Sequence, residues 1–182
     1  SSSEDDGWRV HFERSADGGR SFVRGPAVHL APGTKGSEPG KGLVGAIQPS
    51  LLELGGDKLL AVGRTQQGRI FEIESGDAGK TWGELRLGNL PNPNAGTDAV
   101  TLADGRHLIV YNHTDKGRSP LNVAVSPDGR AWRPVVALET KPGEFSYPAV
   151  IQTADGLVHV TYTWNREAIA RVVIDPKKLP WP

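Results

Sequence analysis

The chain is patterned as a series of short runs in which apolar and polar residues alternate, and most runs end at a turn rich in aspartate and glycine. Typical runs cover residues 49–54, 107–111 and 121–125. Alternation over this length indicates half-buried β-strands, and Asp-Gly turns between such runs indicate antiparallel hairpins. No stretch shows a sustained helical period. The pattern therefore predicts an all-β protein.

Two short motifs repeat along this pattern. The sequence S-x-D-x-G-x-[ST]-[WF] occurs at residues 15–22 and 75–82, and a version one residue shorter occurs at 126–132; their first serines are 60 and 51 residues apart. A second element, an apolar run closed by an Asp/Gly turn, recurs at Asp57, Asp104 and Asp155, which are 47 and 51 residues apart. Four strands fit into each period. This is the organisation of a β-propeller built from four-stranded antiparallel blades.

The serine–aspartate motif has a structural explanation that requires no activity. Its aspartate can accept backbone N–H groups, its glycine can adopt a positive φ, and its aromatic residue can pack between sheets. We therefore expect the motif to shape turns and to carry no chemistry.

The repeats divide the chain into about three blades of one partial propeller spanning residues 1–182. Residues 1–30 are expected to end one blade, with residues 8–12 as its third strand. Residues 43–90 and 94–140 are expected to form one blade each, and 145–176 an incomplete last blade. A closed propeller needs at least four blades, and open sheet edges favour association. We expect either a missing N-terminal half or a second copy, as a homodimer, to complete the ring.

Composition narrows the possible partners. The chain has 21 lysine and arginine residues, 21 aspartate and glutamate residues and no cysteine. A neutral chain is a poor duplex binder, and the apolar runs are too short to cross a bilayer, so neither nucleic acid nor membrane is expected as a partner. Disulfides are excluded, and the histidines lack metal-ligand spacing, so no metal and no cofactor are expected. No signal peptide is apparent, which leaves the localisation open.

The repeated motifs resemble the Asp boxes, or BNR repeats, of the sialidase (neuraminidase) superfamily. The resemblance covers nearly the whole chain and is to the C-terminal half of such a protein. Between the boxes, Gln48 leads to Arg64, Arg118 precedes the strand entering the third box, and Tyr147 precedes an apolar strand. Residues 91–98 and 162–166 are similar to the bacterial sialidase-like branch. The resemblance implies a propeller that is six-bladed when complete and a secreted or periplasmic protein.

The resemblance also implies a site. Arg64 and Arg118 would hold the carboxylate of a sialic or uronic acid, because a guanidinium donates two parallel charge-assisted hydrogen bonds. Tyr147 would be the catalytic tyrosine. Polar side chains on loops between blades can face a ligand, so the expected substrate-binding residues are Arg64, Arg118, Gln48, Asn94 and Asp98.

The chain departs from the superfamily at the base that activates the tyrosine. Gln48 stands where a glutamate is expected, and a neutral amide cannot take a proton from a phenol. Glu144, three residues before Tyr147, is the candidate substitute and is assigned with Tyr147 to the catalytic set. The first arginine of the sialidase triad and the acid/base aspartate belong to blades that precede those present here. Alternatively, the arginines are surface ion-pair partners and Tyr147 is a packing residue.

Two classes of function stay open. The first is an exo-glycosidase, a glycoside hydrolase acting on terminal acidic sugars through an arginine clamp and a tyrosine, with a uronate-eliminating lyase as a variant. The second is a non-catalytic propeller that binds carbohydrate or serves as a scaffold. An acidic carbohydrate is the expected ligand of the first class. The arginines and Tyr147 favour the first class, whereas Gln48 favours the second.

Overall fold

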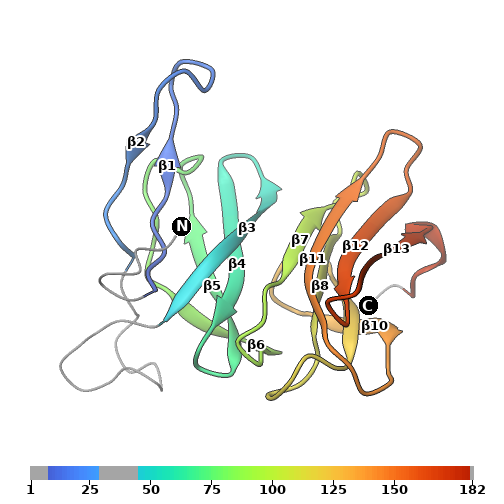
Figure 1. Cartoon of the computed structure of the whole chain (residues 1–182). Coiled ribbons are helices and arrows are strands. Elements are labelled where there is room, and N and C mark those ends of the chain that lie inside the picture. The colour runs from blue at the N-terminus through green and yellow to red at the C-terminus, as the bar shows by residue number, and fades with distance from the viewer. Residues whose placement is uncertain (1–7, 29–44, 181–182) are drawn as a thin grey trace.

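The computed structural model describes residues 8–28 and 45–180, which form thirteen strands in four antiparallel sheets (Figure 1). A two-stranded sheet pairs β1 (Glu13–Arg14) with β2 (Val23–Arg24). The next sheet contains β3 (Ala46–Gly55), β4 (Lys58–Thr65), β5 (Arg69–Ser75) and β6 (Arg86–Pro91). The third contains β7 (Asp98–Thr101), β8 (His107–Asn112), β9 (Leu121–Ser126) and β10 (Arg133–Glu139). The fourth contains β11 (Phe145–Gln152), β12 (Val158–Trp164) and β13 (Ala168–Ile174), followed by the 3-10 helix η1 (Pro176–Lys178).

The three larger sheets are arranged around their first strands. Strand β7 packs against β3 on one side and β11 on the other, so the inner strands of successive sheets are neighbours (Figure 1). Side chains tie these strands together: the Glu53 N–H donates to Thr101 Oγ1 at 2.9 Å, and the Ala103 N–H donates to Gln152 Oε1 at 2.7 Å. The prediction of an all-β fold with four-stranded antiparallel blades is confirmed.

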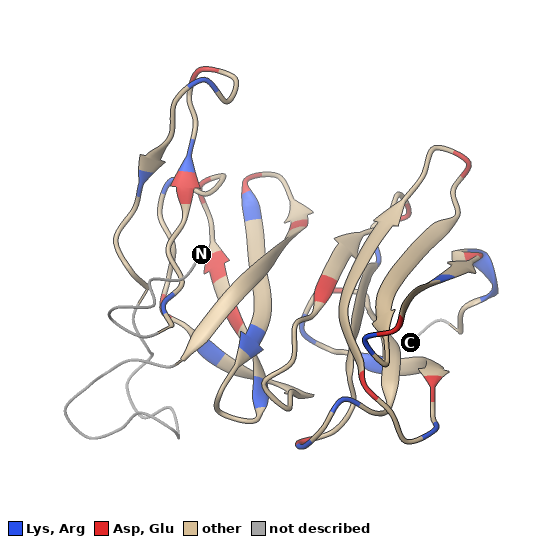
Figure 2. Cartoon of the chain, viewed as in Figure 1, with Lys and Arg blue, Asp and Glu red and all other residues tan. Residues whose placement is uncertain are grey.

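The core lies between consecutive sheets. Strand β8 is buried at every position, because its two faces are covered by the sheets on either side. One cluster joins Leu60 to Ile109 between the first two blades, and another joins Val123 to Val160 between the last two. In the three larger sheets, charged residues concentrate at strand ends and turns, and most of each strand is free of them (Figure 2). Burial of apolar faces between the blades thus holds the blades together.

The Asp boxes form closely similar turns at the ends of their third strands. In the second box, the Ser75 hydroxyl and the Thr81 N–H and hydroxyl all donate to the Asp77 carboxylate. These bonds, led by that from the Thr81 hydroxyl, lower the pKa of Asp77 to about 2. In the third box, Asp128 accepts the N–H groups of Arg130 and Ala131 at 2.9 and 2.7 Å. The boxes act as turn-forming units, as their sequence predicts.

The N-terminal segment differs from its prediction. Residues 8–12 are expected to be a strand, but the assigned strand covers only Glu13–Arg14. The pairing continues irregularly, with the Gly25 N–H donating to the Phe12 carbonyl and the Val28 N–H to the Val10 carbonyl. No described segment pairs with the other side of this hairpin, which leaves it irregular. The expected blade limits at residues 30 and 43 lie outside the described residues.

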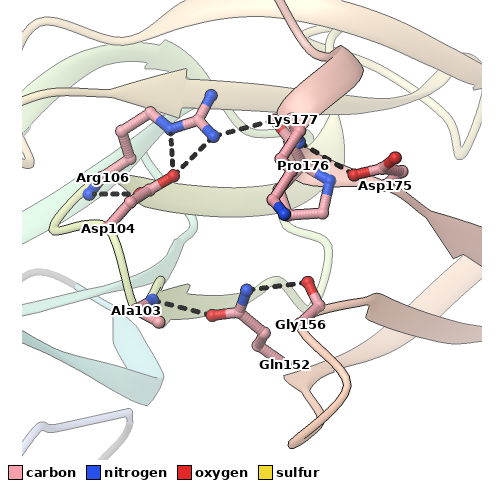
Figure 3. Close-up of polar contacts among 8 residues, drawn as sticks. All are labelled: Ala103, Asp104, Arg106, Gln152, Gly156, Asp175, Pro176 and Lys177. Atoms are coloured by element: carbon pink, nitrogen blue, oxygen red, sulfur yellow. Dashed lines mark hydrogen bonds and ion pairs between the residues drawn. The ribbon is translucent and has the colours of Figure 1, made fainter.

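The C-terminal segment is anchored to the neighbouring blade (Figure 3). Arg106 is buried, and its Nε and Nη2 both donate to Asp104 Oδ2. Its Nη2 also donates to the Pro176 carbonyl at 2.8 Å. On the same side, the Gln152 amide bridges Ala103 to Gly156. Within the described ranges, no helix has the length and apolar character needed to span a membrane.

Candidate functional site

Backbone strain concentrates at the beginnings of the inner strands. Gln48, Asn94 and Tyr147 have φ values of 58°, 59° and 49°, which are unusual for residues other than glycine. Gln48 and Tyr147 each precede a proline, at register shifts in the β3–β4 and β11–β12 pairings. Such bulges redirect side chains and often lie beside functional sites. Here both side chains line one cavity of about 220 Å³.

The cavity spans the three inner strands. Its wall contains Gln48, Pro49 and Ser50 from β3, Gly96, Thr97 and Asp98 from the approach to β7, and Tyr147 and Pro148 from β11. Three of the seven residues that the sequence assigns to the site, Gln48, Asp98 and Tyr147, therefore lie together on its wall.

Arg64 lies next to this cavity at the end of β4 and is only 6% exposed. Its Nε donates to Asn94 Oδ1 at 3.1 Å and its Nη1 to Gln48 Oε1 at 3.2 Å. The Trp8 ring covers the guanidinium, with Cζ 4.5 Å from the ring centroid, a cation–π contact. Neutral groups thus fix the position of Arg64, and it forms no ion pair with any described carboxylate.

Arg118 is a second arginine that forms no ion pair with any described residue. It lies half-buried on the loop before β9, and its buried Nη1 has no hydrogen-bond partner in the described part of the chain. Burial, and next the charge of Arg64, lower its pKa, and Tyr147 and Glu144 also lie within electrostatic range. The Asn112 amide and the Phe145 N–H donate to the Arg118 carbonyl and hold the loop in place. The structure therefore brings Arg64, Arg118 and Tyr147 into one electrostatic neighbourhood.

Glu144 is engaged away from the tyrosine. Its carboxylate accepts the Arg166 Nε at 2.7 Å and the Ser146 hydroxyl at 3.4 Å. This bond with Glu144 raises the pKa of Arg166. Among the described contacts, none joins Glu144 to the Tyr147 phenol. Its role as a base stays a prediction, without support from this geometry.

Asp98 holds the frame of the site. One carboxylate oxygen accepts the Ser50 hydroxyl at 2.7 Å and the Ala99 N–H, and the other accepts the Val150 N–H at 2.8 Å. One side chain on β7 therefore binds both β3 and β11, close to the bulges that carry Gln48 and Tyr147. The side-chain oxygen of Asn94 likewise accepts a hydrogen bond, from Arg64. These two residues position other groups, and their expected contact with a ligand stays a prediction.

Sequence reasoning overlooked Trp8 and Gly96. Trp8 was expected only as part of a strand. Its stacking on Arg64 joins the segment before β1 to strand β4. Gly96 lies between Gln48 and Tyr147. Both of these residues precede a proline, and this repeated pair was the sequence signal that could have pointed to the site around Gly96. Within the described ranges, no group of three or more histidine, aspartate or glutamate side chains is suited to a metal ion.

Successive antiparallel sheets, with Asp boxes in the turns between neighbouring strands of a sheet, define the protein as part of a β-propeller, and comparison with known proteins gives the family. The model of the BNR repeat-like domain matches residues 1–160, and the chain belongs to this family. No curated protein matches the sequence.

Solved structures confirm the sialidase-like fold. The NanB sialidase from Streptococcus pneumoniae is 13% identical, with a TM-score of 0.72 over 96% of this chain and 28% of its own. The intramolecular trans-sialidase from Ruminococcus gnavus, in complex with oseltamivir carboxylate, is 17% identical, with a TM-score of 0.69 over 94% of this chain and 39% of its own. The Aleuria aurantia lectin, in complex with α-methyl-L-fucoside, is 13% identical, with a TM-score of 0.62 over 96% of this chain and 52% of its own. The chain thus spans well under half the length of these two sialidases.

Proposed function

We propose that this chain binds an acidic sugar, as part of a sialidase-like propeller, with the ligand carboxylate held between Arg64 and Arg118. The observation that supports the proposal is that Arg64 and Arg118 lie within electrostatic range of each other and that neither has a carboxylate partner among the described residues. Two like charges in a partly buried site repel each other, and a bound anion relieves this repulsion.

The nature of the ligand is supported by the relatives. Pneumococcal NanB is named a sialidase, and the Ruminococcus gnavus enzyme binds oseltamivir carboxylate. Both names point to sialic acid or a carboxylate mimic of it. A planar guanidinium suits such a carboxylate because two N–H groups can donate in parallel. We therefore take N-acetylneuraminic acid as the first ligand to test.

We favour binding over efficient hydrolysis for this chain. Tyr147 is half-exposed on the cavity wall and could face the ligand carbon next to the carboxylate. To attack that carbon, its phenol would have to lose a proton, and Gln48 cannot accept one. Glu144 is already paired with Arg166. Exo-glycosidase activity is the second candidate, favoured by Tyr147, and hydrolysis of an aryl sialoside by this chain would support it.

Arginine variants test the proposal. Calorimetry with N-acetylneuraminic acid should show affinity reduced by about tenfold or more in Arg64→Ala and in Arg118→Ala, because each change removes a charged hydrogen-bond donor. Arg130→Ala is the matched control, since Arg130 pairs with Glu74 beside the third Asp box. Equal affinity in the wild type and both site variants would refute the carboxylate clamp.

A further inference from the structure

Gln48 and Tyr147 form two side-chain walls of the cavity, and a glycine, Gly96, lies between them. In each blade, the first regular pair after the strained segment is Ser50 with Val62, Asp98 with Val110, or Ala149 with Thr161. Two residues before these positions lie Gln48, Gly96 and Tyr147. The three residues are therefore equivalent in successive blades, and only the middle blade presents no side chain.

Gly96 is required for space and not for an unusual backbone. It is buried, and its φ lies outside the left-handed region that favours glycine. A Cβ atom at this position would lie 3.1 Å from Tyr147 Cδ1 and 3.5 Å from Gln48 Oε1. The tyrosine ring and the glutamine amide thus meet directly over the glycine. A methyl group there would press on the ring.

We infer that Gly96 is a positioning residue: because it has no side chain, the Tyr147 ring and the Gln48 amide can pack over it, and their positions shape a seat for the sugar ring. The inference rests on the proposed function: with the carboxylate on Arg64 and Arg118, the rest of the ligand extends over the 220 Å³ cavity between Gln48 and Tyr147. A larger residue at position 96 would displace the Tyr147 ring and so change the shape of the seat.

The walls determine which part of the ligand enters the seat. Gln48 offers an amide, Tyr147 a phenol, and Pro49 and Pro148 apolar surface, while Asp98 adds a negative charge. A second carboxylate would be repelled by Asp98, whereas the hydroxyl or amide N–H groups of a sugar can donate to these oxygens. The seat therefore takes the neutral, hydroxylated part of an acidic sugar.

Enlarging Gly96 should affect the ligand and not the fold. Tyr147 is 55% exposed, so its ring can move by the few tenths of an ångström that a methyl group demands. Gly96→Ala should weaken N-acetylneuraminic acid about tenfold, a loss of ~1.4 kcal/mol. Acetate, which reaches only the arginines, should bind as in the wild type. Gly76→Ala is the matched control, because Gly76 has open space around it and no positive φ.

Two further readouts locate the effect. The ring resonances of Tyr147, assigned by Tyr147→Phe in protein labelled with ¹³C-tyrosine, should shift in Gly96→Ala and stay in place in Gly76→Ala. In a Tyr147→Ala background, where the crowded ring is absent, Gly96→Ala should lower affinity by a clearly smaller factor, because the two positions are in contact.

The possible failures are distinguishable. If Gly96→Ala binds N-acetylneuraminic acid like the wild type while Arg118→Ala does not, the seat is wrong and the proposed function stands. If Arg64→Ala and Arg118→Ala also bind it normally, the proposed function itself fails. A fall in Tm of more than about 5 °C in Gly96→Ala would assign the glycine to folding and overturn the inference.

Discussion

Arg106, Arg130 and Arg166 each form an ion pair with a carboxylate, whereas Arg64 and Arg118 form none with any described residue. Neutral partners hold Arg64 instead, and burial lowers the pKa of Arg118. Leaving a buried charge without a counter-charge costs stability, so such a pair is expected where a ligand supplies the counter-charge. Under the proposed function, the residues that bind the ligand also make the empty site less stable.

Asp98 provides a test at the scale of one residue. Asp98→Asn removes an acceptor from either the Val150 N–H or the Ser50 hydroxyl, and should lower the free energy of unfolding in urea by about 1–3 kcal/mol. Ser50→Ala, which removes only one partner, should cost less. If Asp98→Asn and the wild type unfold at the same urea concentration, the carboxylate does not bind the inner strands together.

The sequence predicted which residue types would gather at the site better than it predicted their contacts. Arg64 and Tyr147 were expected at the site from the resemblance to the sialidase superfamily. The bonds of Asp98 reach residues 48 and 52 positions away and cross between sheets. No local pattern specifies such contacts. The role of Gly96 was missed because it depends on the lack of a side chain beside Tyr147 and Gln48, and a single glycine in a loop carries no sequence signal of such a contact.

At the scale of elements, the third Asp box packs against the neighbouring blade. Gly129 in the third box has a φ of 75°, and a Cβ atom there would lie 2.8 Å from Leu60 Cδ2 in the preceding sheet. The turn is therefore inserted against the first blade, and its glycine serves both conformation and packing. The hairpin turn at Gly105 needs only the conformation, because nothing lies within 4 Å of its Cβ position.

These two glycines make a matched pair. Gly105→Ala should lower the free energy of unfolding by about 1–2 kcal/mol, because a residue with a Cβ atom is strained in the left-handed conformation. Gly129→Ala should cost about 1–3 kcal/mol more, because the methyl group also overpacks Leu60. Urea unfolding of both variants measures the difference. Equal losses would show that the box turn does not depend on close contact with the neighbouring blade.

Strand positions were the most predictable elements, because period-two alternation and Asp-Gly turns are local signals. Strands β8 and β9 begin and end within a residue of their predicted runs. The exception is the N-terminal strand, whose predicted range at residues 8–12 precedes the observed strand at Glu13–Arg14. The extent of a strand depends on the residues with which it pairs, and its own sequence does not specify those partners.

At the scale of the molecule, the described sheets contain two, four, four and three strands. The last sheet exposes large apolar side chains: Ile151 is 59% exposed, Ile169 79% and Val173 45%. Edge strands and exposed apolar faces favour association. Spacing of the motifs predicted the blades and the incomplete ring, but no sequence pattern identifies what completes it.

We expect this chain to associate with a second copy. In light scattering, the particle should have a mass well above the 19.5 kDa of one chain. Ile169→Lys should shift the equilibrium toward monomer, because it places a charge on the exposed apolar face. A stable, cooperatively unfolding monomer would contradict the expectation and would mean that the open edges are tolerated.

The central claim is that Arg64 and Arg118, which have no carboxylate partner among the described residues, bind the carboxylate of an acidic sugar. Calorimetry on the unaltered chain, comparing N-acetylneuraminic acid with its methyl ester, tests it most directly, since the two ligands differ mainly in that charge. The account predicts that the ester binds about tenfold more weakly or worse, because it cannot accept charge-assisted hydrogen bonds from both guanidinium groups. Equal affinity for acid and ester, or binding of neither, would contradict it.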